Sequence, residues 1–197
     1  LMIRRPPRST LDRSSAASDV YKRQPQLLPG VDPDITAVVE KKLVKHGAKI
    51  MKNAKAVGYE KNADGSLSVK LDVGDGKTET VQTDVVLVAV GMRPNGAGLG
   101  LEEIGVKVER GFVPTDKVGR TNIPSVWAIG DVSGVPMLAH KASKEGEVAA
   151  EVIAGHHAEK DWVAIPGAIF TDPEVAVVGL TETQAKEKGL NLSLIHI

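Results

Sequence analysis

The segment that most constrains the fold of this chain runs from Val126 to Gly155, where a short apolar run ends on a Gly-Asp pair and a helix-patterned stretch follows. The apolar residues 126–129 are typical of a strand that is buried on both faces. Asp131 then lies at the carboxyl end of that strand, next to the free backbone donors of a helix N-terminus. Because α/β proteins present ligand sites in this way, we predict a cofactor site here. The spacing alone fits an acid that caps an ordinary turn equally well.

The predicted helix combines an unusually small inner face with many charged residues. Its small and apolar residues recur at the helical steps of three and four; they are Ala139, Ala142, Gly146, Ala149, Ala150, Ile153 and Ala154. The charged residues lie mostly between these positions and are Lys141, Lys144, Glu145, Glu147 and Glu151. The pattern predicts an amphipathic helix that approaches its neighbours closely. His140, at its start, is by itself more typical of a structural histidine than of a catalytic one.

Two further helices are indicated by their capping residues. Asp32 followed by Pro33 is typical of a helix N-terminus, and Gly47 ends the same helix. We expect its buried face to consist of Ile35, Val38, Val39, Leu43 and His46. Thr181 and Gln184 have the spacing of a capping box, which predicts another helix that continues through residue 188.

Two apolar patterns predict strands. Alternating apolar residues at 67–73 predict the middle strand of an antiparallel meander that spans residues 55–83. Asp72 and Asp75 lack the regular acidic spacing of a calcium-binding loop, so we assign them to a turn. The continuous apolar run 85–90 instead predicts a buried strand of a parallel sheet, ended by a glycine.

Composition narrows the class of protein. The chain has 197 residues, 42% of them hydrophobic, and a formal net charge of zero, which suits a core of one domain or slightly more and gives no reason to expect a nucleic-acid partner. It contains no cysteine, which excludes a disulfide scaffold, a thiolate metal site and dithiol chemistry by this chain alone. No apolar stretch approaches membrane-spanning length and no segment has a signal-peptide core, so we expect no membrane partner.

The first 24 residues differ from the rest. Residues 1–24 are rich in Arg and Ser and show neither hydrophobic period. One interpretation is a basic transit peptide. The alternative, which we favour, is translated sequencing-adapter sequence, because the stretches RRPPRSTL and SDVYKRQ resemble it, and we expect the same origin for residues 192–197.

The stretches AIGDV and MLAHKASKEG, at 128–132 and 137–146, resemble the flavin-binding segment of the dihydrolipoamide dehydrogenases, among the FAD-dependent pyridine nucleotide-disulfide oxidoreductases. Three other segments resemble this family in the same chain order, at 27–35, 85–95 and 171–189. The resemblance covers the chain from residue 25 to residue 191.

The resemblance implies an α/β fold, namely part of a flavoprotein with two Rossmann-like dinucleotide-binding domains, an antiparallel β-meander and the start of an α+β interface domain. Residues 25–95 correspond to the C-terminal part of the NAD-binding domain. Residues 96–160 correspond to the returning FAD-binding and central segment, and 161–191 to the start of the dimerisation domain.

The resemblance also implies which residues meet the cofactors. In the family, the acid that matches Asp131 binds the ribityl chain of FAD, and the backbone around Ala139 and His140 meets the pyrimidine edge of the flavin ring. The residues implied for FAD are Gly130, Asp131, Met137, Leu138, Ala139 and His140. Those implied for NAD are Ala89, Val90, Gly91 and, toward the adenine end, Ala56. Without the resemblance, residues 89–91 fit an ordinary strand-to-loop turn.

The activity implied is the FAD-dependent oxidation of dihydrolipoamide with NAD as acceptor, by a homodimer whose partners are lipoyl domains of 2-oxo acid dehydrogenase complexes or of the glycine cleavage system. The chain has no GxGxxG loop, no redox cysteine pair and no C-terminal His/Glu pair, so we expect it to be inactive alone. The alternatives are a non-catalytic dinucleotide-binding module, or another flavin disulfide reductase or transhydrogenase of this fold. We expect a cytoplasmic location in a prokaryote, with the mitochondrial matrix or a plastid as alternatives.

Overall fold

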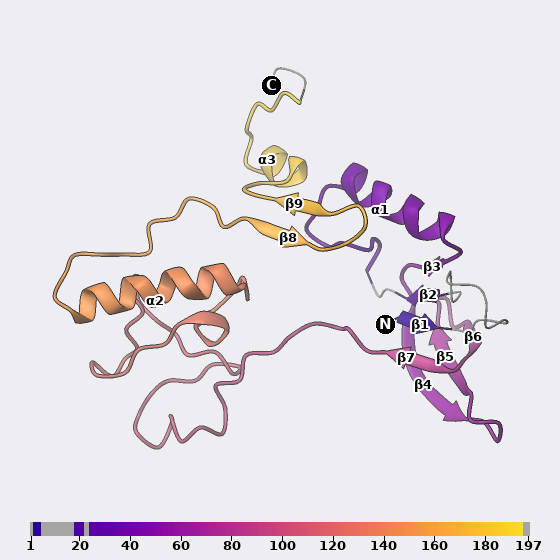
Figure 1. The fold of residues 1–197 in the computed structure, drawn as a ribbon, viewed down its shortest axis with the longest axis horizontal. Coiled ribbons are helices and arrows are strands. Elements are labelled where there is room, and N and C mark those ends of the chain that lie inside the picture. The colour runs from indigo at the N-terminus through magenta and orange to yellow at the C-terminus, as the bar shows by residue number, and fades with distance from the viewer. Residues whose placement is uncertain (1, 5–17, 22–23, 195–197) are drawn as a thin grey trace, which may run out of the picture. The chain divides into compact units, whose positions relative to one another are not determined.

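The computed structural model describes residues 2–4, 18–21 and 24–194, which form two compact units (Figure 1). One unit combines residues 1–90 with 168–197, and the other consists of residues 91–167. These boundaries lie within seven residues of those expected after residues 95 and 160. Most of the segment 1–24 and the last three residues of 192–197 lie outside the described residues.

The first unit contains a mixed sheet with the order β3-β2-β1-β7. Its strands are β1 (Met2–Arg4), β2 (Ser18–Tyr21), β3 (Lys49–Met51) and β7 (Val85–Leu87). Strand β2 runs parallel to β3, whereas β1 is antiparallel to both of its neighbours. Strands β1 and β2 lie inside the segment 1–24, whose sequence shows neither hydrophobic period.

The prediction of a buried parallel strand over 85–90 is wrong in three respects. Strand β7 ends at Leu87, it pairs antiparallel with β1, and both Val85 and Leu87 are exposed. A buried parallel strand needs neighbours on both edges and cover on both faces. Within the described sheet β7 is an edge strand with one neighbour; Val86 packs against the core of the meander, whereas Val85 and Leu87 remain exposed.

The predicted antiparallel meander is confirmed. It consists of β4 (Lys55–Lys61), β5 (Leu67–Asp72) and β6 (Thr78–Thr83), in the order β4-β5-β6. The alternation at 67–73 points Val69 and Leu71 into a small core with Ala54 and Val81. Asp72 accepts a hydrogen bond from the Gly74 N–H at 3.0 Å, which is the turn role assigned to it.

The helix predicted after Asp32 is α1 (Pro33–Lys45). Its buried face differs from the prediction, because Thr36 and Val39 are buried whereas Ile35, Val38 and His46 are exposed. The reason is the position of the hairpin of β8 (Gly167–Ile169) and β9 (Val175–Val177), which packs on the stripe through Val39 and Leu43. Periodicity identifies that a helix is amphipathic, but it leaves open which neighbour covers it.

The capping box of Thr181 and Gln184 is confirmed at the start of α3 (Glu182–Glu187). The Thr181 side chain accepts from the Gln184 N–H at 3.2 Å, and the Gln184 side chain accepts from the Thr181 N–H at 3.0 Å. Asp32 does not cap its own helix; its carboxylate accepts instead from the Glu182 N–H at 3.0 Å. A residue 150 positions away in sequence therefore secures the start of α3.

The second unit contains the short 3-10 helix η1 (Gly130–Ser133) and α2 (Ala139–Ile153), over a core of Val106, Val113 and Ala128. The strand predicted over 126–129 does not form. The run forms only a single bridge, between Trp127 and Arg120, in which the Ala128 N–H donates to Gly119 O and the Thr121 N–H donates to Val126 O, both at 3.0 Å. No helix in the described part of either unit is long and apolar enough to cross a membrane.

Candidate functional site

The predicted ligand site lies where η1 packs against α2, within the second unit. Gly130 begins η1 with a φ of +79°, a conformation that favours glycine. A Cβ on Gly130 would lie 3.3 Å from the Cβ of Ala142, and one on Gly146 would lie 3.4 Å from Cδ1 of Ile129. Small residues therefore allow the close approach that the pattern of the helix predicted.

The inner face of α2 also contains two charged residues that we placed outside it. Lys141 and Glu145 are each only 4% exposed, whereas Ala139, Ala150 and Ile153 of the predicted apolar face are exposed. Charged groups are buried in proteins when they are paired and hydrogen-bonded. Lys141 and Glu145 are one helical turn apart, and Nζ lies 3.2 Å from Oε2.

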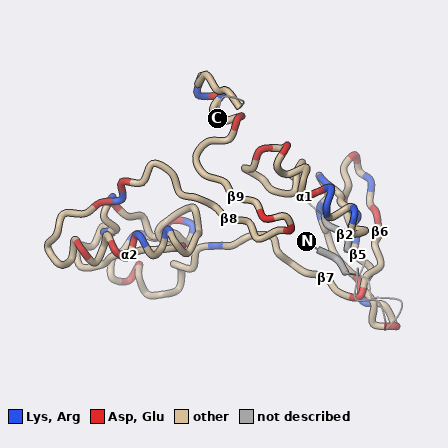
Figure 2. Tube along the Cα trace, turned by 45° about the horizontal axis from the view of Figure 1, so that its top comes forward, with Lys and Arg blue, Asp and Glu red and all other residues tan. Residues whose placement is uncertain are grey.

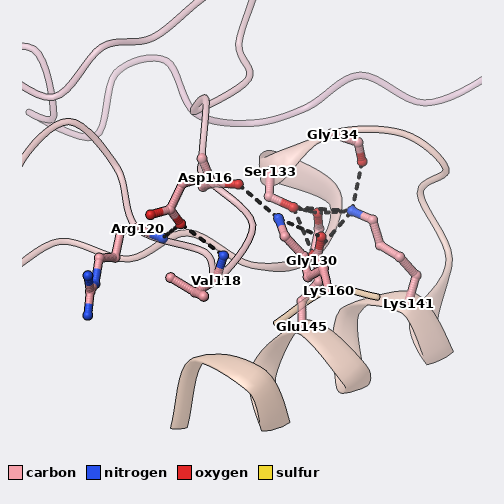
Figure 3. A network of polar contacts seen from close by, with 10 residues as sticks. Asp116, Val118, Arg120, Gly130, Ser133, Gly134, Lys141, Glu145 and Lys160 are labelled. Carbon is pink, nitrogen blue, oxygen red and sulfur yellow. Dashed lines mark hydrogen bonds and ion pairs between the residues drawn. The ribbon is translucent and has the colours of Figure 1, made fainter. Parts of the chain in front are cut away.

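The Lys141–Glu145 pair holds the backbone of η1 from both sides (Figure 3). Glu145 Oε2 accepts from the Gly130 N–H at 2.7 Å and lies 2.8 Å from the Ser133 hydroxyl. Lys141 Nζ donates to the carbonyl oxygens of Gly130 and Gly134, both at 2.8 Å. Both polar backbone groups of Gly130, the residue before Asp131, are therefore bound by opposite members of one buried ion pair.

A second cation and a hollow border this network. Lys160 Nζ lies 3.8 Å from Glu145 Oε1 and donates to the Thr115 hydroxyl at 3.2 Å. A hollow of about 370 Å³ is open beside these side chains, and Trp162 forms part of its wall. The carboxylate of Asp116 accepts from the backbone N–H groups of Val118 and Arg120, both at 2.9 Å, and so closes the neighbouring turn.

The residues expected to meet FAD belong to η1, to the start of α2 and to the segment that joins them. Asp131 is exposed, and among the described residues its carboxylate has no hydrogen-bond partner. Met137 and Leu138 are half-buried and lead into α2, whose first two residues are the exposed Ala139 and His140. Leu138 occupies the N-cap and has no capping side-chain atom, so the amides of the first turn remain available to an acceptor.

His140 is also tied to a later segment. Its Nε2 lies 2.7 Å from the carbonyl oxygen of Pro166, a distance at which the ring N–H donates to the carbonyl. This contact and the Lys141–Glu145 pair fix the beginning of α2 from two directions. The His140 side chain therefore makes a structural contact, as its position at a helix start indicated.

The residues expected to meet NAD are placed differently. Ala56 lies on β4, is exposed, and lines a groove of about 740 Å³ together with Val86 and Val88. Ala89 and Val90 follow β7 and are exposed, with no polar side chain holding their backbone among the described residues. Gly91, with a φ of +125°, is the first residue of the other unit. The structure thus places Ala56 beside the end of β7.

Charge is distributed evenly over both units. Lys and Arg as well as Asp and Glu occur in both units (Figure 2), and most of the ion pairs are exposed. On α2 itself, the exposed Lys144 pairs with Glu147 at 3.1 Å, which raises the pKa of the Lys144 ammonium group through the hydrogen bond to that carboxylate. The buried Lys141–Glu145 pair is therefore distinguished by its burial and not by its residue types.

Comparison with known families now identifies the chain. A family model described as pyridine nucleotide-disulphide oxidoreductase matches residues 11–146, and a model of the dimerisation domain of the same family matches residues 165–197. The chain belongs to the pyridine nucleotide-disulphide oxidoreductase family. The match begins at residue 11, inside the segment 1–24 that we expected to lie outside the family.

Curated relatives support membership of this oxidoreductase family. The dihydrolipoyl dehydrogenase of Bacillus subtilis is 48% identical over 169 residues, which are 85% of this chain and 36% of the relative. The mitochondrial dihydrolipoyl dehydrogenase of Sus scrofa is 41% identical over 163 residues, or 82% of this chain and 32% of the relative. The chain therefore spans about a third of the length of these relatives.

Solved structures of this oxidoreductase family confirm the predicted fold class. LpdA from Mycobacterium tuberculosis superposes with a TM-score of 0.76 and 29% identity, over 86% of this chain and 36% of that protein. The flavoprotein disulfide reductase RclA from Escherichia coli gives a TM-score of 0.77 and 26% identity, over 86% of this chain and 38% of that protein. The chain therefore has the fold of the matching part of a flavoprotein disulfide reductase.

Sequence reasoning missed the Lys141–Glu145 pair, although a signal was present. A Gly-Asp turn that packs closely on a helix leaves backbone N–H and C=O groups that need partners. A Lys and a Glu four residues apart, flanked by Ala142 and Gly146, supply one donor and one acceptor on that face. The hydrogen-bond partners that the backbone of this turn requires therefore point to Lys141 and Glu145, which hydrophobic periodicity does not identify.

Proposed function

We propose that this chain is the part of a dihydrolipoyl dehydrogenase that lines one side of the FAD site and part of the NAD site. The observation that carries the proposal is the exposed carboxylate of Asp131, without a hydrogen-bond partner among the described residues, in the element η1 that packs against α2, whose N-terminus has no side-chain cap. The names of the curated relatives support the assignment to dihydrolipoyl dehydrogenase rather than to a more distant disulfide reductase.

The residues at η1 and α2 fit FAD. Asp131 accepts hydrogen bonds from the hydroxyl groups of the ribityl chain. The backbone from Met137 to His140 faces the pyrimidine edge of the ring, where the free amides and the partial positive charge of the helix N-terminus favour an electron-rich atom. The absence of a side chain on Gly130 keeps η1 close to the helix, so that both groups face the same ligand.

Toward NAD, we propose contacts through the backbone of Ala89, Val90 and Gly91 and through Ala56 near the adenine. Their exposure and the groove beside Ala56, Val86 and Val88 support this proposal. When bound, FAD supplies the electron transfer between a dithiol and NAD. The chain has no cysteine and therefore contributes binding and orientation, but no dithiol chemistry.

The proposed assembly is a homodimer, supported by the match of residues 165–197 to the dimerisation domain. Its proposed partners are lipoyl domains of 2-oxo acid dehydrogenase complexes or of the glycine cleavage system. Bacterial proteins are among the most similar curated relatives, which supports a cytoplasmic location, whereas the similarity to a mitochondrial relative keeps the mitochondrial matrix as the alternative.

A chimera tests this proposal. Residues 25–191 replace the matching segment of the Bacillus subtilis dihydrolipoyl dehydrogenase, which supplies the remaining two thirds of that protein. We expect the chimera to bind FAD and to reduce NAD with dihydrolipoamide, as followed by the absorbance of NADH. The substitution Asp131→Ala in the chimera should weaken FAD binding, whereas Asp161→Ala, at an acid of the same unit outside η1 and α2, should not. A folded chimera without flavin, or with flavin but inert toward dihydrolipoamide, contradicts the proposal.

The 197-residue chain provides a second test, because it contains only one side of the flavin site. We expect it to purify without FAD and to catalyse no NAD reduction with dihydrolipoamide. A stoichiometric yellow protein would show that these residues hold FAD by themselves, and would favour the alternative of a self-contained dinucleotide-binding module.

A further inference from the structure

We infer that the buried Lys141–Glu145 pair positions the flavin-binding groups, by fixing the backbone that carries Asp131 against the start of α2. The inference rests on the proposed function, because the ligand of Asp131 is taken to be the ribityl chain of FAD. Lys141 and Glu145 are positioning residues in this account and do not themselves contact the cofactor.

The geometry of Gly130 is the first argument. Its N–H donates to Glu145 and its C=O accepts from Lys141, at 2.7 Å and 2.8 Å. These two bonds, together with one from the Ser133 hydroxyl to the Gly130 C=O at 2.8 Å, restrain both peptide planes that flank Gly130, and the second of these planes leads directly into Asp131. A change in either bond therefore rotates the Cα–Cβ direction of Asp131 relative to α2.

The location of the pair on α2 is the second argument. Lys141 and Glu145 occupy the first two turns of the helix whose N-terminal residues, Ala139 and His140, face the flavin ring in the proposed site. Lys141 Nζ also donates to the Gly134 carbonyl, so the pair spans the whole of η1. The same two side chains thus link the carboxylate for the ribityl chain to the amides for the ring.

Burial is the third argument. Lys141 and Glu145 are each only 4% exposed, so their hydrogen bonds to η1 do not compete with bulk water. The pair Lys144–Glu147 on the same helix provides a matched control, because it has the same residue types but is exposed and contacts no part of η1. A purely local helix-stabilising effect would be similar for both pairs.

The first experiment uses the 197-residue chain and measures hydrogen exchange of the Gly130 amide by NMR. Substitutions Glu145→Gln and Lys141→Met should accelerate this exchange by about tenfold or more, since a hydrogen bond to a charged acceptor is lost or weakened. Lys144→Met and Glu147→Gln should leave it within twofold. Unchanged exchange in variants that retain the wild-type fold by circular dichroism overturns the inference.

The second experiment uses the flavoprotein encoded by the complete gene. Among folded variants, Glu145→Gln and Lys141→Met should raise the dissociation constant of FAD on the order of tenfold, as is typical when an outer partner of a ligand-binding group is removed. They should also change the visible circular dichroism of the bound flavin, which a general loss of stability does not alter. The control variants Lys144→Met and Glu147→Gln should match wild type.

The two experiments separate the failure of the inference from that of the proposed function. A wild-type gene product without FAD overturns the proposed function, whereas Gly130 exchange still reports whether the pair holds η1. Wild-type FAD affinity and flavin circular dichroism in the Lys141 and Glu145 variants overturn the inference and leave the proposed function intact. A loss of FAD affinity in Glu145→Leu that is larger than the loss in Glu145→Gln, which retains a hydrogen-bond acceptor, supports positioning through the Gly130 N–H.

Discussion

The flavin-side region at η1 and α2 and the nucleotide-side region at the end of β7 begin from the same kind of sequence, an apolar run followed by a glycine. In the first region the glycine is Gly130, and a buried ion pair binds its N–H and C=O. In the second the glycine is Gly91, which follows the exposed residues Ala89 and Val90. The contacts of the backbone that follows an apolar run therefore depend on side chains that come from elsewhere in the chain, and not on the apolar run.

The comparison predicts that the flavin-side region loses most when its ion pair is broken. Glu145→Gln leaves the buried Lys141 without its carboxylate partner, and Lys141→Met leaves Glu145 with only the more distant Lys160, at 3.8 Å. We expect a loss of up to about 3–5 kcal/mol in the free energy of unfolding. Both tryptophans of the chain, Trp127 and Trp162, lie in the second unit, so urea unfolding followed by tryptophan fluorescence reports on this unit. The exposed-pair variant Lys144→Met should leave the transition unchanged. Equal unfolding transitions in urea for Lys141→Met and Lys144→Met would show that the buried pair stabilises this unit no more than the exposed pair does.

A smaller loss is expected from Gly130→Ala. The positive φ costs an alanine about 1–2 kcal/mol, and the contact of the new Cβ with Ala142 at 3.3 Å adds to this, so we expect about 2–4 kcal/mol in total. Gly155→Ala is the control, because its φ is +89° and no atom lies within 4 Å of the new Cβ. A loss at Gly130 no larger than at Gly155, by the same fluorescence measurement, would mean that η1 does not pack closely on α2.

Substitution on the nucleotide side should change stability very little. Val90 is 79% exposed and follows the edge strand β7, so Val90→Ser should change the free energy of unfolding by less than about 0.5 kcal/mol. Urea unfolding followed by far-ultraviolet circular dichroism measures this change. A clear loss would indicate that the end of β7 is packed as tightly as η1, and the contrast between the two regions would disappear.

The smallest effect concerns an exposed pair of the meander. The hydrogen bond from Lys70 lowers the pKa of the Glu60 carboxyl, so the pair adds stability that is present above the usual pKa of a glutamate and is lost as pH falls through the lowered value. In Lys70→Met, an NMR titration should show the pKa of Glu60 rising toward its usual range. The pKa of Asp64, which the hydroxyl of Ser66 lowers, should stay where it is. An unchanged pKa of Glu60 in Lys70→Met would contradict the assignment of this lowered pKa to Lys70.

Local signals in the sequence predicted the elements well. The Asp32-Pro33 start of α1, the alternation through Val69 and Leu71, and the capping box at Thr181 each depend on residues within a few positions of one another. Such features are decided by neighbours in the chain, so the sequence determines them directly. The positions of Asp131 and of the start of α2 followed from the same kind of signal.

The features that the sequence did not predict depend on partners that are distant in the chain. The covered face of α1 is set by the hairpin β8–β9, and the carboxylate of Asp32 caps α3 instead of its own helix. The run 85–90 is apolar enough for a buried strand, but burial requires neighbours that the described sheet does not provide on its β7 edge. Lys141 and Glu145 are likewise buried because they form hydrogen bonds with the C=O and N–H groups of Gly130.

A double-mutant cycle on α2 tests most directly the claim that the Lys141–Glu145 pair holds the flavin-side region. Unfolding of Lys141→Met, Glu145→Gln and the double variant is followed by tryptophan fluorescence, beside the same cycle for Lys144 and Glu147. The account predicts a coupling energy of about 2–3 kcal/mol for the buried pair, because the double variant removes both charges together, and a several-fold smaller coupling for the exposed pair. Equal coupling energies for the two pairs would contradict it.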